Sequence, residues 1–326
     1  AFILVFALVK TTSDTWKYVF IQSGSLLIAN TALWLCIPKA FFNVKKPFQN
    51  KEIDLKSIIS LFVPQIAIDV YVLLDKSMLG ALTNVAVVGF YDKAEQFAKL
   101  PLSILAIFST VMLPVMSSLF EAKEREKIVE YLNHNLRIIL LTSIPAAFGV
   151  AGIAPQFIPW MLGKDFTPSI NLMVLLGSLI PLISISNVIG RQYLIPSNHS
   201  KQLTVSVTCG ACINLALNLI LIPKHQAIGA CIATIVAELM VSVIQIYFTR
   251  TMISTKPLLI CLAKCTAAGS GMFLIICKLG IFWGATIYTT LLQITVGALL
   301  YFFILLAIKE RTMLELIQVL LKRTAN

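Results

Sequence analysis

Charged residues are scarce in this sequence of 326 residues: they make up 13% of the chain, whereas a soluble domain contains about 25%. Four long stretches contain no Asp, Glu, Lys or Arg, namely residues 18–37, 138–163, 166–190 and 279–308. A helix needs about 20 apolar residues to cross the hydrocarbon core of a membrane, so each stretch is long enough to span it. The scarcity of charge predicts an integral membrane protein, all-α and polytopic.

The sequence also lacks the patterns of other classes. The short segments of alternating polar and apolar residues that build membrane barrels are absent. There is no nucleophile elbow and no glycine-rich phosphate loop, and the three histidines lie in different connections. A membrane-embedded glycosyl transferase would need a sizeable loop to hold its acceptor, and the connections here are short. An enzyme is therefore the minority interpretation, and we expect no catalytic residue, no cofactor and no metal.

Cysteine gives little further information. All seven cysteines fall within apolar runs. Cys209 and Cys212 have the spacing of a redox or zinc motif, but no second pair and no histidine lies near them in the sequence. The pattern favours small residues that pack between helices.

The net charge of +11 is placed between the spans, which indicates membrane lipids as partners and no nucleic acid. Alternate connections contain 17 basic residues on one side and 5 on the other. Because cytoplasmic loops carry the excess of Lys and Arg, the first set and the C-terminus are predicted to be cytoplasmic.

Nine spans are predicted, and between them lie two segments of different character. The polar and basic residues 38–56 are expected to form a cytoplasmic linker, and residues 309–326 an interfacial amphipathic helix. The predicted spans are about 18–37, 57–79, 88–119, 138–162, 168–195, 203–222, 227–249, 257–277 and 285–308. The third of them, 88–119, is longer than a bilayer needs, so we expect it to tilt, to bend at Pro101 or Pro114, or to protrude from the membrane.

The second and third of these spans, 57–79 and 88–119, form a hairpin with seven charged residues, and a charge inside a membrane is costly enough to indicate function. If the turn is centred on Asn84, each acid lies at the depth of a base. The predicted pairs are Asp75 with Lys93, Lys76 with Asp92, and Asp69 with Lys99, the last pair near the midplane. Glu95 has no evident partner in the hairpin, so it is expected to be protonated or to pair elsewhere. The alternative for the outer charges is that they are interfacial, with lysines that reach water.

The candidate cavity residues of this hairpin are Gln65, Asp69, Lys76, Lys93, Glu95, Gln96 and Lys99. A possible second polar site comprises Asn214, Asn218, Glu238 and Lys264. Asn214 and Asn218 share a helix face, and Glu238 lies at a similar depth on the next span, which favours hydrogen bonds between helices over a proton or cation site. Lys264 lies about two turns into its helix and could reach the cytoplasmic interface.

Several short motifs resemble the polysaccharide transporter branch, the O-antigen flippase type, of the multidrug/oligosaccharidyl-lipid/polysaccharide exporter superfamily. They are Asp75-Lys76-Ser77-Met78-Leu79-Gly80, Val88-Gly89-Phe90-Tyr91, Asn218-Leu219-Ile220-Leu221-Ile222-Pro223 and Ile228-Gly229-Ala230, with Pro101 and Pro114 in order between them. One departure is the turn at 224–227, where the family usually has a glycine.

The resemblance implies two six-helix lobes around a central cavity, with two additional helices. On that basis residues 1–37 would end the first lobe, most of which is missing from the sequence. Residues 57–250 would form the second lobe and residues 257–308 the additional pair. The implied function is translocation of an undecaprenyl-diphosphate-linked oligosaccharide across the bacterial cytoplasmic membrane by alternating access. A glycan polymerase and glycosyltransferases of the same pathway would be further partners. A cation-coupled multidrug exporter is the alternative, with Asp69 and Glu95 as coupling acids.

The predicted orientation can be tested by labelling. Cysteines placed at Lys45, Lys127 and Lys201 should be shielded from a membrane-impermeant reagent in intact cells, because these positions are predicted to be cytoplasmic. Cysteines at Lys164 and Lys224 should react. Labelling of the first set from outside would overturn both the orientation and the number of spans.

Overall fold

The computed structural model describes residues 14–35 and 73–315, with isolated positions before residue 12, between 62 and 69, and at 318. It divides the chain into two compact units, residues 1–54 and 55–326. The first unit contains helix α2 (Thr15–Leu35), which confirms the helix predicted there. The predicted linker 38–56 lies outside the described residues.

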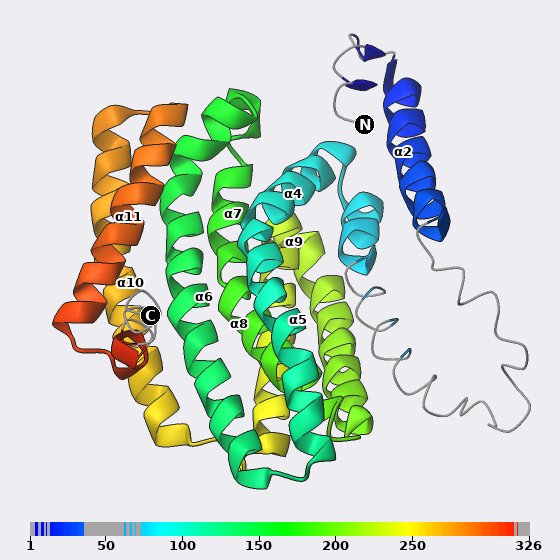
Figure 1. The fold of residues 1–326 in the computed structure, drawn as a ribbon. Coiled ribbons are helices and arrows are strands. Elements are labelled where there is room, and N and C mark those ends of the chain that lie inside the picture. The colour runs from blue at the N-terminus through cyan, green and yellow to red at the C-terminus, as the bar shows by residue number, and fades with distance from the viewer. Residues whose placement is uncertain are drawn as a thin grey trace, which may run out of the picture. The chain divides into compact units, whose positions relative to one another are not determined.

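Every element of the second unit that the structure describes is a helix (Figure 1). A helical segment, residues 73–82, precedes α4. The elements are then α4 (Val85–Ala98), α5 (Leu100–Glu121), α6 (Arg125–Met161), η3 (Lys164–Phe166), α7 (Ser169–Gly177), α8 (Leu179–Asn187), η4 (Val188–Leu194), α9 (Ser200–Thr249), α10 (Thr255–Trp283) and α11 (Ile287–Ala307).

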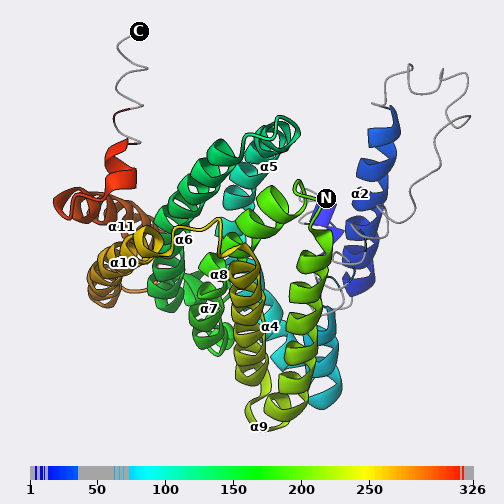
Figure 2. The ribbon, with the colours of Figure 1, turned by 90° about the horizontal axis from the view of Figure 1, so that it is seen from below.

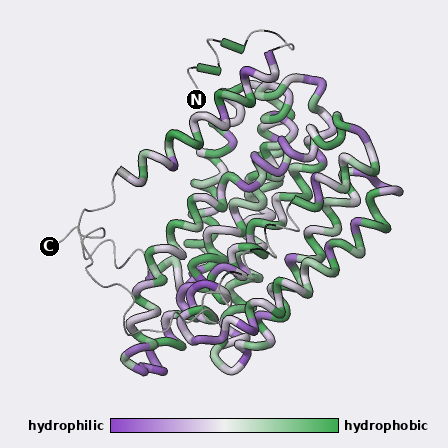
Figure 3. Tube along the Cα trace, turned by 90° about the vertical axis from the view of Figure 1, so that its right-hand side faces the viewer, coloured by the Kyte–Doolittle hydropathy of each residue, from purple (hydrophilic) through white to green (hydrophobic). Residues whose placement is uncertain are grey.

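The apolar stretches of the sequence became the long helices. Six described helical segments are long and apolar enough to cross a membrane: α5, α6, the run from α7 to η4, α9, α10 and α11. Figure 3 shows apolar residues along these helices and hydrophilic residues mostly at their ends. The prediction of an all-α, polytopic membrane protein is confirmed.

Helix α9 contains two of the predicted spans, because the chain folds back within it at Gln226. This residue has a φ of 50°, in the left-handed region that favours glycine. Gly229 then lies against the backbone of Leu221, so close that a Cβ at residue 229 would collide with it. The turn in which the family usually has a glycine is thus made here by a glutamine.

The boundaries of two helices, α5 and α6, differ from those of the predicted spans. The predicted span 88–119 is interrupted at Lys99, so that α4 ends there and α5 begins with Pro101 in its first turn; this confirms the bend at the first of the two prolines. Residues 125–137, a charged stretch between two of the predicted spans, form the start of α6, with Ile128 and Leu132 buried. The apolar residues of this stretch recur at helical spacing, which its charges obscured.

Helix α6 is the central element of the second unit. It packs against α5, α7, α8, α10 and α11, and both views show the α10–α11 pair beside it (Figures 1 and 2). Polar bonds reinforce this packing. The Trp160 Nε1 donates to Thr290 on α11 at 2.8 Å, and the Tyr301 hydroxyl donates to the Leu141 carbonyl at 3.0 Å. Inside a membrane such bonds matter because lipid offers no alternative partner.

The cysteines are only partly the packing residues that the sequence indicated. Of the six described, all free, Cys231, Cys261 and Cys265 are buried, whereas Cys209 and Cys212 are exposed. The packing interpretation is therefore wrong for the pair at 209 and 212, and both must be replaced before a labelling experiment.

Small residues allow α6 and α10 to approach closely. A Cβ at Gly152 of α6 would collide with the Ile276 side chain of α10, and a Cβ at Gly269 would lie 2.5 Å from the Phe148 ring. Close approach at glycines is a usual feature of helix pairs in membranes, because packing rather than the hydrophobic effect holds them together.

This close approach gives a matched pair of variants on one helix. Gly152→Ala should lower the free energy of unfolding by about 1–3 kcal/mol, because the added methyl group forces α6 and α10 apart. Gly149→Ala meets no atom within 4 Å and should be neutral or stabilise the helix by up to about 1 kcal/mol. Thermal unfolding in lipid nanodiscs measures both, and equal effects of the two variants would contradict the described packing.

Candidate functional site

Five charged residues of the predicted hairpin lie on the segment 73–82 and on α4, which a short turn joins, and Lys99 directly follows α4. Asn84 caps α4, and its side-chain oxygen accepts a hydrogen bond from the Val87 backbone N–H at 2.9 Å. This cap fixes where α4 begins and hence which depth each of its residues reaches.

Lys76 is the centre of an ion-pair cluster. Its Nζ lies 2.6 Å from Asp92 Oδ1 and 3.1 Å from Glu95 Oε2. The pairing of Lys76 with Asp92 that equal depth predicts is therefore confirmed. Both side chains are about a third or more exposed, at 34% and 40%, so the pair lies at the boundary of the protein interior.

Glu95 has two partners within the hairpin, so the expectation that it finds no partner there is wrong. Its carboxylate lies between Lys76 and Lys99, with Lys99 Nζ 2.6 Å from Oε1. The side chain is only 9% exposed, so two lysines stabilise a carboxylate that is nearly buried. The error arose because the search considered only residues at equal depth across the hairpin, whereas Lys76 lies about one turn away in depth and Lys99 lies one turn along the same chain.

Lys93 is the least constrained lysine of the cluster. Its Nζ is 3.9 Å from Asp92 and donates to Gln96 Oε1 at 3.4 Å, and its side chain is 39% exposed. Its predicted partner, Asp75, is hydrogen-bonded to Asn218 and Thr234 instead, so the predicted pair of Asp75 with Lys93 is wrong. The pairing of Asp69 with Lys99 stays a prediction, and Gln65 lies outside the described residues.

Asp75 is buried in a polar cluster that it shares with α4 and both halves of α9. Asn218 Nδ2 donates to one carboxylate oxygen at 2.5 Å, while the hydroxyl groups of Thr234 and Tyr91 lie 2.6 and 3.3 Å from the other. Asn214 accepts from Asn218 at 3.0 Å. The shared face of the two asparagines is confirmed, but their acidic neighbour is Asp75.

Sequence reasoning missed Thr234 and Tyr91 because neither carries a charge. Depth matching compared only the two arms of the hairpin, and Thr234 reaches Asp75 from a helix 159 residues away. Glu238 is buried on the same half of α9, and its pairing with Asn214 stays a prediction.

Lys264 does not join this cluster. It lies on α10, where its Nζ is 3.2 Å from Glu310 and donates to the Lys309 carbonyl at 3.3 Å. The second polar site predicted from the sequence therefore divides into two places, one at Asp75 and one at the end of α11.

The Asp75 cluster gathers oxygen atoms of a carboxylate, two amides and two hydroxyls. Oxygen ligands of this kind suit a proton or a small hard cation better than a transition metal. Among the residues that the structure describes, no group of three or more His, Cys, Asp or Glu side chains could hold a metal ion.

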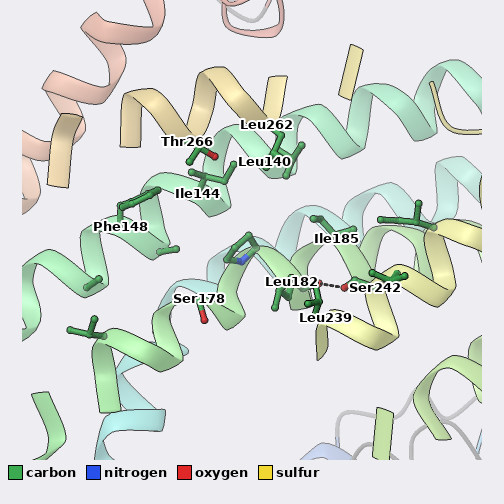
Figure 4. A pocket seen from close by; sticks show the side chains of 16 residues that line it. Leu140, Ile144, Phe148, Ser178, Leu182, Ile185, Leu239, Ser242, Leu262 and Thr266 are labelled. Carbon is green, nitrogen blue, oxygen red and sulfur yellow. Dashed lines mark hydrogen bonds between the residues drawn. The ribbon is translucent and has the colours of Figure 1, made fainter. Parts of the chain in front are cut away.

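An apolar cavity of about 490 Å³ lies between α6, the α7–α8 run, the second half of α9, and α10. Figure 4 shows Leu140 and Ile144 of α6 on one wall, Leu182 and Ile185 on the opposite wall, and Leu262 of α10 above them. The dashed bond, in which Ser242 donates to the Leu182 carbonyl at 3.0 Å, ties α9 to α8 at its edge. The cavity is large enough for a segment of a hydrocarbon chain.

Comparison with known proteins adds the following. The family described as polysaccharide biosynthesis protein matches residues 1–120. The chain is 23% identical over 310 residues to a probable low-salt glycan biosynthesis flippase of Haloferax volcanii, covering 88% of this chain and 63% of that protein. It is 25% identical to a proposed O-antigen transporter of Escherichia coli, covering 79% of this chain and 61% of that protein.

Among solved structures, the chain is similar to a lipid II flippase, MurJ, in an inward closed conformation. The TM-score is 0.63 at 20% sequence identity, over 76% of this chain and 51% of that one. The chain thus spans about six tenths of the length of the two curated relatives and half of the solved flippase. The resemblance to the polysaccharide transporter branch is confirmed, and the chain is a multi-pass helical membrane protein that shares its fold with a flippase.

Proposed function

We propose that the chain is part of a flippase that moves an undecaprenyl-diphosphate-linked oligosaccharide unit across the cytoplasmic membrane by alternating access. The names of the two curated relatives, a glycan flippase and an O-antigen transporter, support this substrate class. The relatives are transporters, which supports a function without catalysis. In this proposal residues 1–37 end the first lobe, 57–250 form the second, and 257–308 are the additional pair.

The observation that carries the proposal is the lysine cluster of Lys76, Lys93 and Lys99. A diphosphate headgroup inside a membrane requires cations. Asp92 and Glu95 balance two of the three lysines, so the cluster keeps a positive excess. Lys93 is the most available, because it is exposed and its nearest acid lies at the limit of an ion pair. Gln96, which accepts its hydrogen bond, could meet a sugar hydroxyl.

The ion pairs also give the cluster a way to release its cargo. Lys76 and Lys99 contact a phosphate only by leaving Glu95, and Glu95 recovers them when the phosphate departs. Binding is then an exchange of anions around the same lysines, so Lys76 and Lys99 have an anionic partner in either state.

The lipid part of the substrate requires apolar surface. The cavity between α6, α8, α9 and α10 has hydrocarbon side chains on almost every wall. It supports the proposal of a lipid-linked substrate over a water-soluble one, because a polar solute gains nothing from such a lining.

A cation-coupled multidrug exporter is the second candidate. The observation that favours it is Asp75, a carboxylate buried among neutral hydrogen-bond donors, which could bind a coupling proton or cation. Glu95, in contrast, is already paired with two lysines, which makes it a poor coupling acid. Coupling to a proton or cation at Asp75 is also compatible with a flippase. The positive excess at Lys93 argues against cationic drugs.

Two further parts of the proposal concern location. The C-terminus is proposed to be cytoplasmic, from the distribution of basic residues. A glycan polymerase and glycosyltransferases that make and use the repeat unit are the proposed functional partners.

Lys93→Ala should lower transport of the lipid-linked glycan by about tenfold or more, the value expected for one lost charge-assisted contact. Its effect on the free energy of unfolding should stay within about 0.5 kcal/mol, because the residue is exposed and weakly paired. Transport is measured in cells that depend on the protein, with the amount of protein in the membrane measured beside it.

Two control variants sharpen this test. Lys93→Arg keeps the charge and should retain most of the transport, and Lys127→Ala removes an exposed lysine that pairs only with Glu124 among the described residues. In contrast, Lys76→Ala should lower transport and also lower the free energy of unfolding by about 1 kcal/mol or more, since it leaves Asp92 with only Lys93 at 3.9 Å and removes one of the two lysines of Glu95. Full transport by a Lys76→Ala, Lys93→Ala double variant would remove the cluster from the mechanism.

A further inference from the structure

A second cavity lies where α10 begins and α11 ends, on the other side of the α10 helix from the apolar one. Its volume is about 480 Å³, and it is formed by α6, the first turns of α10, and residues 310–311 after α11. It belongs neither to the charged cluster of the hairpin nor to the Asp75 cluster.

The charge of this pocket is strongly positive. Arg137, Lys256, Lys264 and Arg311 line it, and Glu310 is its single acid. Glu310 is nearly buried at 4% exposure and is neutralised by Lys264 at 3.2 Å. Arg311 pairs with Glu315 outside the lining at 2.8 Å, so two of the four basic side chains, Arg137 and Lys256, stay uncompensated within the described part of the chain.

Two of the basic side chains have no acidic partner among the described residues. The Arg137 Nε donates to the Asn133 carbonyl at 3.3 Å, a bond that orients the guanidinium and leaves its charge unbalanced. Lys256 is exposed at the second position of α10. Unbalanced cations that converge on one cavity give it a positive potential, which favours the binding of an anion.

The N-terminus of α10 adds to the positive potential of the pocket. The helix runs from Thr255 to Trp283, and its positive end opens beside the pocket. Ser254 precedes it, with its hydroxyl not used to cap the helix. Its backbone N–H donates to Asn133 Oδ1 at 2.7 Å. Ser254 lines the edge of the pocket, where its hydroxyl can bind a ligand.

The pocket is also apolar along part of its wall, where Pro257 and Ile260 line it. Lys264 lies nine residues after Thr255, which is about 13 Å along the helix. The cavity thus extends from the start of α10 along the first turns of a helix that is long and apolar enough to cross a membrane. A free anion needs only the charged part of such a pocket, whereas a phospholipid uses both parts.

We propose that this pocket binds the phosphate headgroup of an anionic phospholipid, with the glycerol and upper acyl chains against Pro257 and Ile260. Basic pockets between membrane helices on the cytoplasmic side are suited to such headgroups. The bound lipid joins α6, α10 and the segment after α11, and so holds the α10–α11 pair in place. The proposal does not depend on what the protein transports.

The test is thermal unfolding of the full chain in nanodiscs of phosphatidylcholine alone or with phosphatidylglycerol. Phosphatidylglycerol should raise the midpoint of the unmodified protein by about 4 °C, as expected for a ligand well above its dissociation constant. Lys256→Gln should lose most of this rise, and Lys256→Arg should keep it. Lys201→Gln is the matched control, since it removes an exposed lysine from another connection, and it should keep the full rise.

Two results would overturn the proposal. One is an equal rise in Lys256→Gln and in the unmodified protein, which would place the lipid effect elsewhere. The other is an equal rise with inorganic phosphate in phosphatidylcholine nanodiscs, which would make the site one for a free anion. If Lys256→Gln does not fold, native mass spectrometry of the unmodified protein decides: phosphatidylglycerol should be retained in preference to phosphatidylcholine, and equal retention contradicts the proposal.

Discussion

The cost of an unpaired charge inside a membrane governs the arrangement of the second unit. The segment 73–82 and α4 carry several charged residues, and each charge whose contacts the structure describes has a compensating neighbour. In the ion-pair cluster around Lys76, Glu95 is the most buried member and contacts two lysines, while Lys76 contacts two acids. Asp75 is compensated in a different way, by three neutral hydrogen-bond donors. These two solutions differ in what they permit. An ion pair can exchange one partner for a phosphate, whereas a buried carboxylate among neutral donors can exchange a proton or a cation.

The helices around these groups are positioned by packing that leaves room for both parts of a lipid-linked substrate. Helix α6 is the common neighbour, and glycine contacts bring α10 close to it. The α8 and α9 helices diverge from this pair and leave the apolar cavity between them. The polar cluster and the apolar cavity thus lie in one helical unit, as a headgroup with a hydrocarbon tail would require.

Much of the fold could be predicted from the sequence, because charge-free runs and membrane thickness leave few alternatives. The break near Pro101 followed from the chemistry of proline, and the turn within α9 from the short polar stretch at 224–226. The start of α6 could not be predicted in this way. Residues 125–137 carry many charges, and only their buried face, with Ile128 and Leu132, shows that the helix begins there.

The site was predictable only in part. Depth matching within the hairpin identified Lys76 and Asp92, since both lie on facing sides of adjacent helices. It failed for Asp75 and Glu95, because depth gives no information on the rotation of a helix about its axis. Asp75 turns towards α9, and Glu95 finds Lys99 on its own chain. Neutral partners such as Thr234 carry no signal in a single sequence, so a search for opposite charges cannot find them.

The central claim is that the protein moves a lipid-linked oligosaccharide between leaflets without changing it. The most direct measurement uses vesicles that contain the protein and a fluorescent undecaprenyl-diphosphate-linked oligosaccharide, with an impermeant glycosidase outside. If the protein is a flippase, the glycosidase removes the glycans of both leaflets, whereas vesicles without protein lose only those of the outer leaflet. Digestion that stops at the outer leaflet in the presence of folded protein would contradict the account. So would the appearance of a new glycan product when the protein is assayed in detergent, because that result identifies an enzyme.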